Sequence, residues 1–261
     1  MIRTERAPVL VGALGGSGTR VVARLLRRAG VFMGSELNEA EDSEPVMRFY
    51  QAWLRPYLER GGELTPAEWE AATARLGLAL EEHLDGAVPR GSWGVKVPRN
   101  ILALGFWHRI FPELSFVHVV RSGLDMAYSK DRNQLRMVGD LVLTPSERRR
   151  PEPEQAIAYW QRVNLEAADF GEARLGPRYL RLRFEDLCAH PARAYAQLRR
   201  LAGAGAEPPE DVFGEVTAPG SLGRWRARPQ AEVERLMAIA ETGSERFGYA
   251  EGAMTQRSGA R

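Results

Sequence analysis

The sequence predicts an α/β fold in which a central parallel sheet lies between two layers of helices. Short apolar runs, typical of buried parallel strands, alternate along the chain with longer amphipathic segments. Such alternation is characteristic of parallel sheets with helices on both faces. The 261 residues suffice for one large domain, or at most two. We expect residues 1–249 to form a single domain and residues 250–261 to form a disordered tail.

Three strands are expected in the first 100 residues. Residues 8–12 and residues 31–33 are short apolar runs, and residues 93–97 form a third that ends at Pro98. Between the first two, residues 21–29 have apolar side chains at helical spacing, with arginines on the other face. These segments predict strand, helix, strand, and a later strand that returns to the same sheet.

The long interval before the third strand, residues 45–86, is predicted to be helical. Its second helix is expected to begin at Thr65-Pro66, a pair typical of helix starts. Residues 115–120 form the most apolar run and predict a central strand, followed by a helix over residues 123–130. Polar, arginine-rich residues then predict a loop over residues 134–153.

The last part of the chain continues the alternation. Residues 154–174 predict a long amphipathic helix, and residues 179–184 alternate as a half-exposed edge strand does. Two more helices are expected at residues 191–203 and 229–246. Ligands of such sheets bind beyond the carboxyl ends of the strands, so the residues that follow each strand are the ones to examine.

Composition excludes several classes of function. The chain has 36 basic residues, of which 34 are arginines and two are lysines, Lys96 and Lys130. Since 34 acidic residues balance them, the net charge is only about +2, and a nucleic-acid polymer is not the expected partner. No run approaches the roughly 20 apolar residues of a membrane span. One cysteine and four scattered histidines predict neither an internal disulfide nor a zinc site. The charged N-terminus is not a secretory signal, so we expect a cytoplasmic protein.

The loop after the first strand has the composition of an anion cradle. Gly15, Gly16 and Gly18 let backbone N–H groups converge, and Ser17 and Thr19 add hydroxyl donors. The helix that begins here adds the positive end of its dipole. A nucleotide triphosphatase loop would carry a lysine where Thr19 stands, and Leu14 breaks the dinucleotide-binding pattern.

A second anion-binding pair follows the central strand. Arg121 stands at the end of that strand, and Ser129 follows eight residues later. A guanidinium can hold a phosphate with two hydrogen bonds, and the serine hydroxyl can contact the same anion. With this pair, the sequence resembles the sulfotransferases that use 3′-phosphoadenosine-5′-phosphosulfate (PAPS). In that family, a Ser-Gly-Thr loop binds the phosphosulfate, and an Arg and Ser pair binds the 3′-phosphate.

The resemblance extends over most of the chain. Residues 93–98 (Trp-Gly-Val-Lys-Val-Pro) resemble the strand that carries a lysine near the sulfonate. Residues 183–187 (Arg-Phe-Glu-Asp-Leu), with Pro191 after them, resemble a strand end of the family, and residues 220–225 resemble the late loop around the nucleotide. The resemblance implies a P-loop NTPase-like fold and transfer of sulfonate from PAPS to a hydroxyl or an amine without a metal, leaving adenosine 3′,5′-bisphosphate.

The resemblance also implies which residues contact the donor. These are Gly15, Gly16, Ser17, Gly18, Thr19, Arg20, Arg121, Ser129, Gly223 and Arg224. Many relatives carry Lys or Arg at the position of Gly16. Arg20 is the nearest cation that could replace it at the leaving phosphate, although an ordinary surface arginine is an equally good interpretation. The basic pair that often precedes the late loop is Ala218-Pro219 here.

The catalytic residues implied by the resemblance are Lys96, Arg20 and a carboxylate base. Cytosolic small-molecule sulfotransferases use a histidine two residues after the lysine, where this chain has Pro98. His108 and His118 fall inside a helix and a strand, which makes them poor substitutes. The carbohydrate and tyrosyl-protein branch uses a carboxylate after the second strand.

Two carboxylates after the second strand, Glu36 and Asp42, are the candidates for that base. Glu36 matches the family spacing best, and Asp42 could reach the pocket if residues 36–44 fold back. An acidic run is more often simply solvated.

The acceptor is not encoded in these motifs. Residues 45–86 and 134–153 are expected to form its lid, and the acceptor could be a carbohydrate, a lipid, a peptide or a natural product. Two alternatives stay open: a P-loop kinase or other phosphotransferase, and a non-catalytic nucleotide-binding protein of the same fold. The missing Gly-Lys-Ser/Thr argues against the first, and Gly16 keeps the second open.

Overall fold

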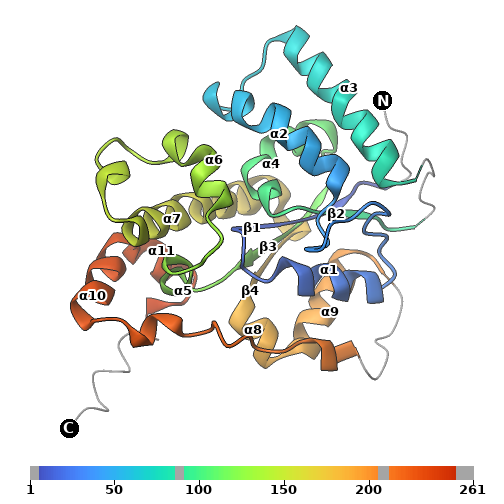
Figure 1. The fold of residues 1–261 in the computed structure, drawn as a ribbon. Helices are drawn as coiled ribbons and strands as arrows, with labels where there is room; N and C mark the ends of the chain where they lie inside the picture. Colours follow the sequence, from blue (N-terminus) through green and yellow to red (C-terminus); the bar gives the residue numbers. More distant parts are fainter. Residues whose placement is uncertain (1–5, 86–90, 205–211, 251–261) are drawn as a thin grey trace.

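The computed structural model describes residues 6–85, 91–204 and 212–250, so the tail expected at residues 250–261 lies almost entirely outside them. The predicted fold class is confirmed. A four-stranded, wholly parallel sheet lies at the centre (Figure 1). Its order is β2-β1-β3-β4, with bounds β1 Val9–Ala13, β2 Gly94–Lys96, β3 Ser115–Val120 and β4 Tyr179–Arg183.

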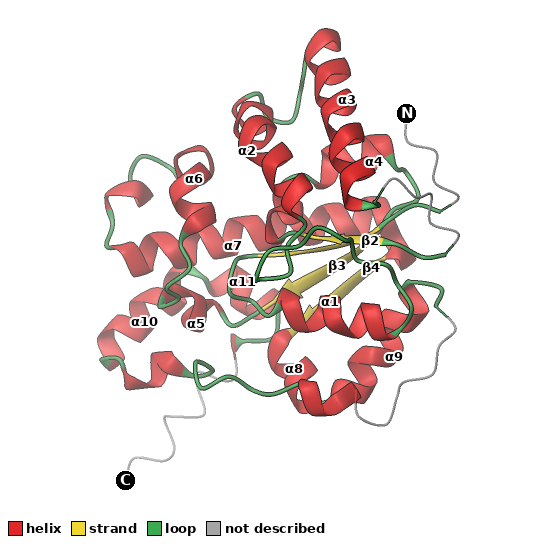
Figure 2. Cartoon of the chain, turned by 45° about the vertical axis from the view of Figure 1, so that its right-hand side comes forward, coloured by secondary structure: helices red, strands yellow, loops and turns green. Residues whose placement is uncertain are grey.

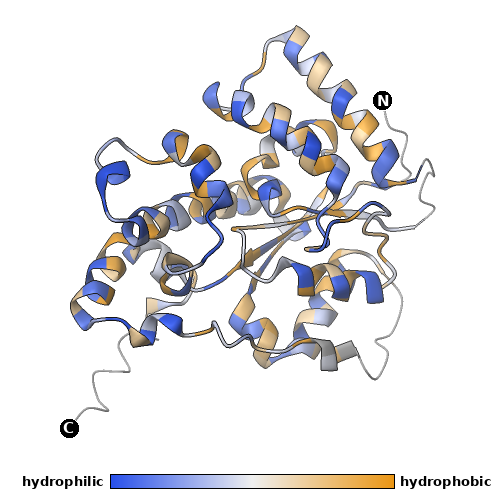
Figure 3. Cartoon of the chain, in the orientation of Figure 1, coloured by the Kyte–Doolittle hydropathy of each residue, from blue (hydrophilic) through white to orange (hydrophobic). Residues whose placement is uncertain are grey.

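Helices cover both faces of this sheet (Figure 2). On one face lie α1 (Thr19–Arg28), α8 (Phe184–Ala189) and α9 (Pro191–Leu201). The other layer holds α2 (Glu44–Glu59), α3 (Pro66–His83), α4 (Leu104–Ile110), α5 (Gly123–Ala127), α6 (Asn133–Val142), α7 (Glu152–Phe170), α10 (Gln230–Ile239) and α11 (Glu241–Arg246). Hydrophobic and hydrophilic residues alternate around these helices (Figure 3), as expected for helices that pack one face on a core.

Each face of the sheet has its own apolar core. In β1, Val9, Val11 and Ala13 join the cluster beneath α1 and α9, whereas Leu10 joins the cluster on the opposite face. This division follows from the two-residue period of a strand. Because both faces are covered, every residue of β1 is buried. The sheet therefore offers a ligand only its strand ends, where the loops begin.

Two expectations in the first half of the chain need correction, and a third is confirmed. The strand expected at residues 31–33 is wrong: only Phe32 makes an isolated bridge, to Trp93. The helix expected over residues 123–130 stops at Ala127. The helical interval 45–86 does hold two helices, and Thr65 caps the second through a reciprocal capping box with Glu68.

The loop expected over residues 134–153 is confirmed for residues 143–151 and wrong for the rest, which is helical. Residues 133–142 form α6, a 3₁₀ turn spans Glu147–Arg149, and α7 begins at Glu152. Most of the polar, arginine-rich residues that suggested a loop lie after α6, whereas α6 itself has one polar face and buries Val138 on the other. The expected edge strand β4 is confirmed, and the last predicted helix is divided at Ala240 into α10 and α11. In the parts of the chain that the structure describes, no helix is long and apolar enough to cross a membrane.

Candidate functional site

The loop between β1 and α1 has the backbone of an anion cradle. Gly16 and Gly18 have φ angles of +84° and +94°, in the left-handed region that favours glycine. A Cβ at position 18 would strike the ring of Phe184, and one at position 15 would strike the carboxylate of Asp131. Side chains are thus excluded at both positions, and the backbone of the loop lies at the N-terminus of α1, where the N–H of Ser17 is bonded to the carbonyl of Leu14 at 3.2 Å.

Arg121 connects this loop to the late loop of the chain. It lies at the end of β3 and is 3% exposed. Its guanidinium donates to the carbonyl of Gly16 at 3.2 Å and to the hydroxyl of Ser221 at 3.0 Å, and it lies 3.4 Å from Asp125. Its Nε is buried without a protein partner. An unpaired buried donor of this kind indicates a ligand acceptor that belongs there.

The late loop is fixed by the same group of residues. The N–H of Gly223 donates to Asp125 at 2.9 Å, and Arg224 donates to the carbonyls of Ser221 and Tyr128, each at 3.0 Å. Burial, and then the nearby charge of Arg121, lower the pKa of Arg224. Two guanidiniums therefore lie close together beside one carboxylate, an arrangement that favours an added anion.

Ser129 also lies at the cradle. Its Oγ is 3.2 Å from the position a Cβ would take on Gly16, and it accepts the N–H of Asp131 at 3.2 Å. The structure thus brings together Gly15–Thr19, Arg121, Ser129, Gly223 and Arg224. All were predicted to contact one donor.

A second group of polar residues surrounds Lys96, at the end of β2. Its side chain is 3% exposed, and its Nζ lies 2.7 Å from Oδ1 of Asp42 and 2.5 Å from the carbonyl oxygen of Ala40. Burial lowers the pKa of Lys96, and Asp42 acts in the opposite direction. The charge of Arg20 also lowers this pKa, which places Arg20 near the ammonium group.

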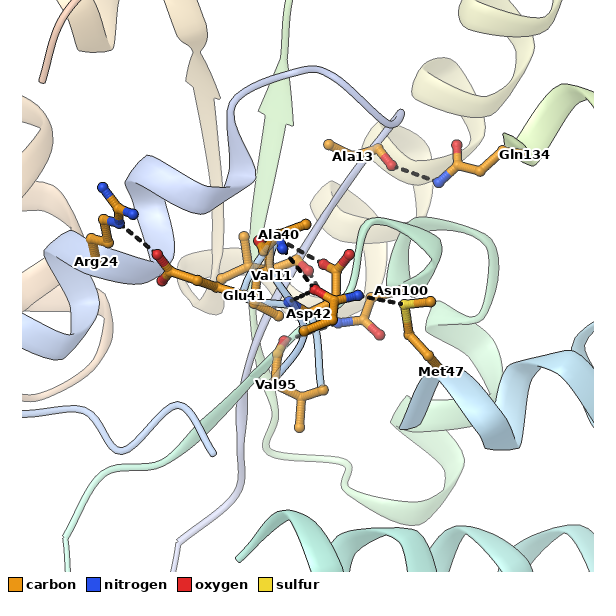
Figure 4. Close-up of polar contacts among 12 residues, drawn as sticks. Val11, Ala13, Arg24, Ala40, Glu41, Asp42, Met47, Val95, Asn100 and Gln134 are labelled. Atoms are coloured by element: carbon orange, nitrogen blue, oxygen red, sulfur yellow. Dashed lines mark hydrogen bonds and ion pairs between the residues drawn. The ribbon is translucent and has the colours of Figure 1, made fainter. Parts of the chain in front are cut away.

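A small hairpin, residues 37–43, carries Asp42 to Lys96. The side chain of Asn38 accepts the N–H groups of Ala40 and Asp42, each at 2.9 Å, and so closes the turn. Glu41 reaches from the hairpin to Arg24 of α1 (Figure 4), at 2.6 Å. These contacts hold the hairpin between α1 and β2, so that Asp42 is buried beside the lysine.

The other predicted catalytic residues lie farther out. Glu36, with a side chain 45% exposed, is bound by Arg48 at 3.0 Å on the surface. The structure therefore brings Asp42, rather than Glu36, to Lys96. Arg20 is exposed on the first turn of α1. His118 is buried, bonded to Asn164 and Tyr179 at 2.8 Å each, which agrees with its expected structural role.

Two buried amides that the sequence did not single out support the site (Figure 4). Asn100 donates to the carbonyls of Val11 and Val95, at 3.0 and 2.9 Å, and so joins the neighbouring strands β1 and β2. Gln134 of α6 donates to the carbonyl of Ala13 at 3.0 Å. No spacing distinguishes either amide from a surface residue. By contrast, the four-residue separation of Arg121, directly after β3, and Asp125, in the first turn of α5, could have indicated their ion pair.

A family model supports the functional prediction. The model of the sulfotransferase family matches residues 8–208, more than three quarters of the chain. None of the curated proteins matches it.

The chain is also similar to solved structures of sulfotransferases. One is the sulfotransferase domain of the curacin biosynthetic pathway, which is 14% identical in sequence and has a TM-score of 0.56. The match covers 95% of this chain and 99% of that domain. A Mycobacterium avium sulfotransferase is 12% identical over 93% and 77% of the two chains, with a TM-score of 0.54. The sulfotransferase domain of a Synechococcus olefin synthase is 17% identical over 93% and 96%, with a TM-score of 0.53.

At these identities, the similarity to solved structures shows a shared fold. Membership is shown by the family model, which spans the cradle, Lys96 and Arg121. The chain therefore belongs to the sulfotransferase family, and the reaction predicted from its motifs, transfer of sulfonate from PAPS to an acceptor, is the reaction of that family.

Proposed function

We propose that PAPS binds across the cradle and the Arg121 group, and that the acceptor is activated beside Lys96. The observation that carries the proposal is Arg121, which joins the cradle to the late loop while its buried Nε stays unpaired. The groups present fit a bisphosphorylated nucleotide: backbone N–H groups at residues 15–19 for one anion, and Arg121 with Ser129 for another.

When bound, PAPS supplies the sulfonate and a phosphate leaving group. The residues of this chain supply positive charge and orientation. The N-terminus of α1 points at the site of the leaving phosphate. Lys96 places an ammonium at the end of β2, where burial strengthens its electrostatic effect. Arg20 adds charge near Lys96 and is proposed to replace the cation that is missing at Gly16.

Asp42 is the proposed base. It is the carboxylate that contacts Lys96, whereas Glu36 is engaged by Arg48. As base, Asp42 would take the proton of the acceptor hydroxyl, and Lys96 would hold the resulting oxygen next to the sulfonate. This assignment, together with Pro98 in place of a histidine, supports the carbohydrate and tyrosyl-protein branch.

Calorimetry tests the proposed donor. We expect adenosine 3′,5′-bisphosphate to bind and ATP not to bind. Arg121→Met should lower the affinity for the bisphosphate by more than tenfold, because a hydrogen bond from a guanidinium to a phosphate is worth about 1.5–3 kcal/mol. Arg136→Met, on the exposed face of α6, is the matched control. Tight binding of ATP without the bisphosphate would favour a kinase and reject the proposal.

The base is tested with paired carboxamide variants. Asp42→Asn should lower kcat at least 100-fold and flatten the acidic limb of the pH–rate profile, while Glu36→Gln should retain activity. The reverse result would assign the base to Glu36, and two active variants would exclude a carboxylate base.

Arg20→Ala should lower kcat with little effect on folding, because its side chain is exposed. Normal turnover would make Arg20 an ordinary surface residue.

A further inference from the structure

The backbone around Arg121 needs hydrogen-bond partners that the sheet does not supply. The ladder between β3 and β4 ends at the pair Val120 and Arg183, and Arg121 directly follows it. Backbone N–H and carbonyl groups beyond the end of a ladder need other partners when they are buried. Here those partners are side chains, and they determine the position from which the guanidinium of Arg121 extends.

Two side chains from separate helices bond to residues 120–122. The indole N–H of Trp160, in α7, donates to the carbonyl of Arg121 at 2.9 Å. Oε1 of Glu185, in α8, accepts the N–H of Ser122 at 3.0 Å. The backbone that carries the Arg121 side chain is therefore held from outside the sheet.

Tyr249, near the end of the described chain, links these contacts. Its hydroxyl donates to Oε2 of Glu185 at 2.7 Å and also lies 3.2 Å from the carbonyl oxygen of Val120. Burial, and then the charge of Glu185, raise the pKa of Tyr249 well above its ordinary value of 10, so the hydroxyl keeps its proton. Both oxygens of Glu185 are thus engaged, one with Ser122 and one with Tyr249.

The ring of Tyr249 is fixed by its packing. It meets the ring of Trp160 edge-on, with centroids 6.3 Å apart, and the guanidinium of Arg183 lies 4.5 Å from its centroid. Phe247 is 2% exposed and packs against the same tryptophan. The family model ends at residue 208, and none of the motifs described above includes Tyr249.

We propose that Tyr249 and Glu185 are positioning residues for the donor, which hold residues 120–122 so that Arg121 meets the 3′-phosphate. The inference rests on the proposed function, which assigns a phosphate of the nucleotide to Arg121 and Ser129. Hydrogen bonds to a phosphate are directional, so a small shift of this backbone weakens them. Tyr249 thereby contributes to nucleotide selectivity through Arg121.

Calorimetry with two nucleotides tests this role: adenosine 3′,5′-bisphosphate, and adenosine 5′-monophosphate, which lacks the 3′-phosphate. Tyr249→Phe removes only the hydroxyl. It should lower the affinity for the bisphosphate three- to tenfold and change the affinity for the monophosphate less than twofold. Tyr179→Phe is the matched control, because its hydroxyl is bonded to His118 at 2.8 Å and not to residues 120–122. It should leave both affinities unchanged.

Two substitutions of Glu185 separate its hydrogen bonds from its charge. The amide in Glu185→Gln can accept the N–H of Ser122 and donate to the oxygen of Tyr249, so this variant should keep the wild-type selectivity. Glu185→Leu can do neither and should lose selectivity at least as much as Tyr249→Phe. An equal loss in both Glu185 variants would assign the effect to charge and overturn the positioning role.

A double variant shows whether Tyr249 acts through Arg121. In an Arg121→Met background, Tyr249→Phe should cause no further loss of bisphosphate affinity. A further loss, or an equal loss for both nucleotides in the single variant, would overturn the inference. A lower melting temperature of Tyr249→Phe with unchanged selectivity would also overturn it, because the tyrosine would then only fasten the C-terminal segment. Wild-type protein that does not bind the bisphosphate, or an Arg121→Met variant with full selectivity, would instead refute the proposed function.

Discussion

Asn100 provides the most quantitative prediction, because all of its polar atoms have buried partners. Its amide donates to the carbonyls of Val11 and Val95, and its oxygen accepts the hydroxyl of Tyr50 at 2.7 Å. Asn100→Leu keeps the size but removes all three bonds and leaves the partners buried. At about 1–2 kcal/mol for each bond, the free energy of unfolding should fall by about 3–6 kcal/mol. For a chain of this length, the melting temperature should fall by on the order of 10 °C.

The same substitution should weaken donor binding, because Asn100 joins the strand that leads into the cradle to the strand that carries Lys96. Thermal unfolding followed by circular dichroism, with calorimetry of adenosine 3′,5′-bisphosphate, measures both effects. Asn133→Leu, on an exposed residue of α6, is the matched control and should change stability by less than about 0.5 kcal/mol. Equal melting temperatures for the two variants would refute the reasoning that Asn100 holds β1 and β2 together.

Two further predictions concern the cradle and the buried histidine. Gly18→Ala should lower bisphosphate affinity by more than tenfold, because a side chain at φ +94° is strained and would strike Phe184; unchanged calorimetry would show that the loop can move. Burial lowers the pKa of His118 to about 4, below its ordinary 6.5, so the folded protein resists a proton that the unfolded chain binds. Stability should therefore fall as the pH drops from 6.5 to 4, by about 3 kcal/mol from this residue. Urea unfolding at pH 7 and pH 4.5 measures this loss of stability, and the loss should be smaller in His118→Gln. An equal loss in the variant would assign the acid sensitivity to other groups.

The sequence identified the elements that have strong local signals. The apolar run at residues 115–120 and the glycines at residues 15–18 were placed correctly, since a buried strand and a left-handed loop constrain composition directly. Residues 31–33 were misjudged because a short apolar run also suits a single bridged residue, Phe32, between two buried neighbours. The helix at residues 133–142 was missed because its outward face is as polar as a loop.

The same division applies to the candidate site. Motif order along the chain was enough to select Lys96, Arg121 and Ser129. Lys96 ends β2 and Arg121 directly follows β3, and the carboxyl ends of parallel strands lie at the same edge of the sheet. Motif order could not choose between Glu36 and Asp42, which stand six residues apart on one loop. Only the hairpin closed by Asn38 directs Asp42 inward and leaves Glu36 in solvent.

The sequence by itself determined the fold class, the family and the strand ends at which chemistry takes place. These depend on local backbone preferences and on apolar periodicity, which are encoded in neighbouring residues. The tertiary structure decided which polar side chains are buried together, such as the pair of Lys96 and Asp42 and the pair of Glu185 and Tyr249. Burial arises from contacts between residues far apart in the chain, and it turns an ordinary polar side chain into one that requires a specific partner.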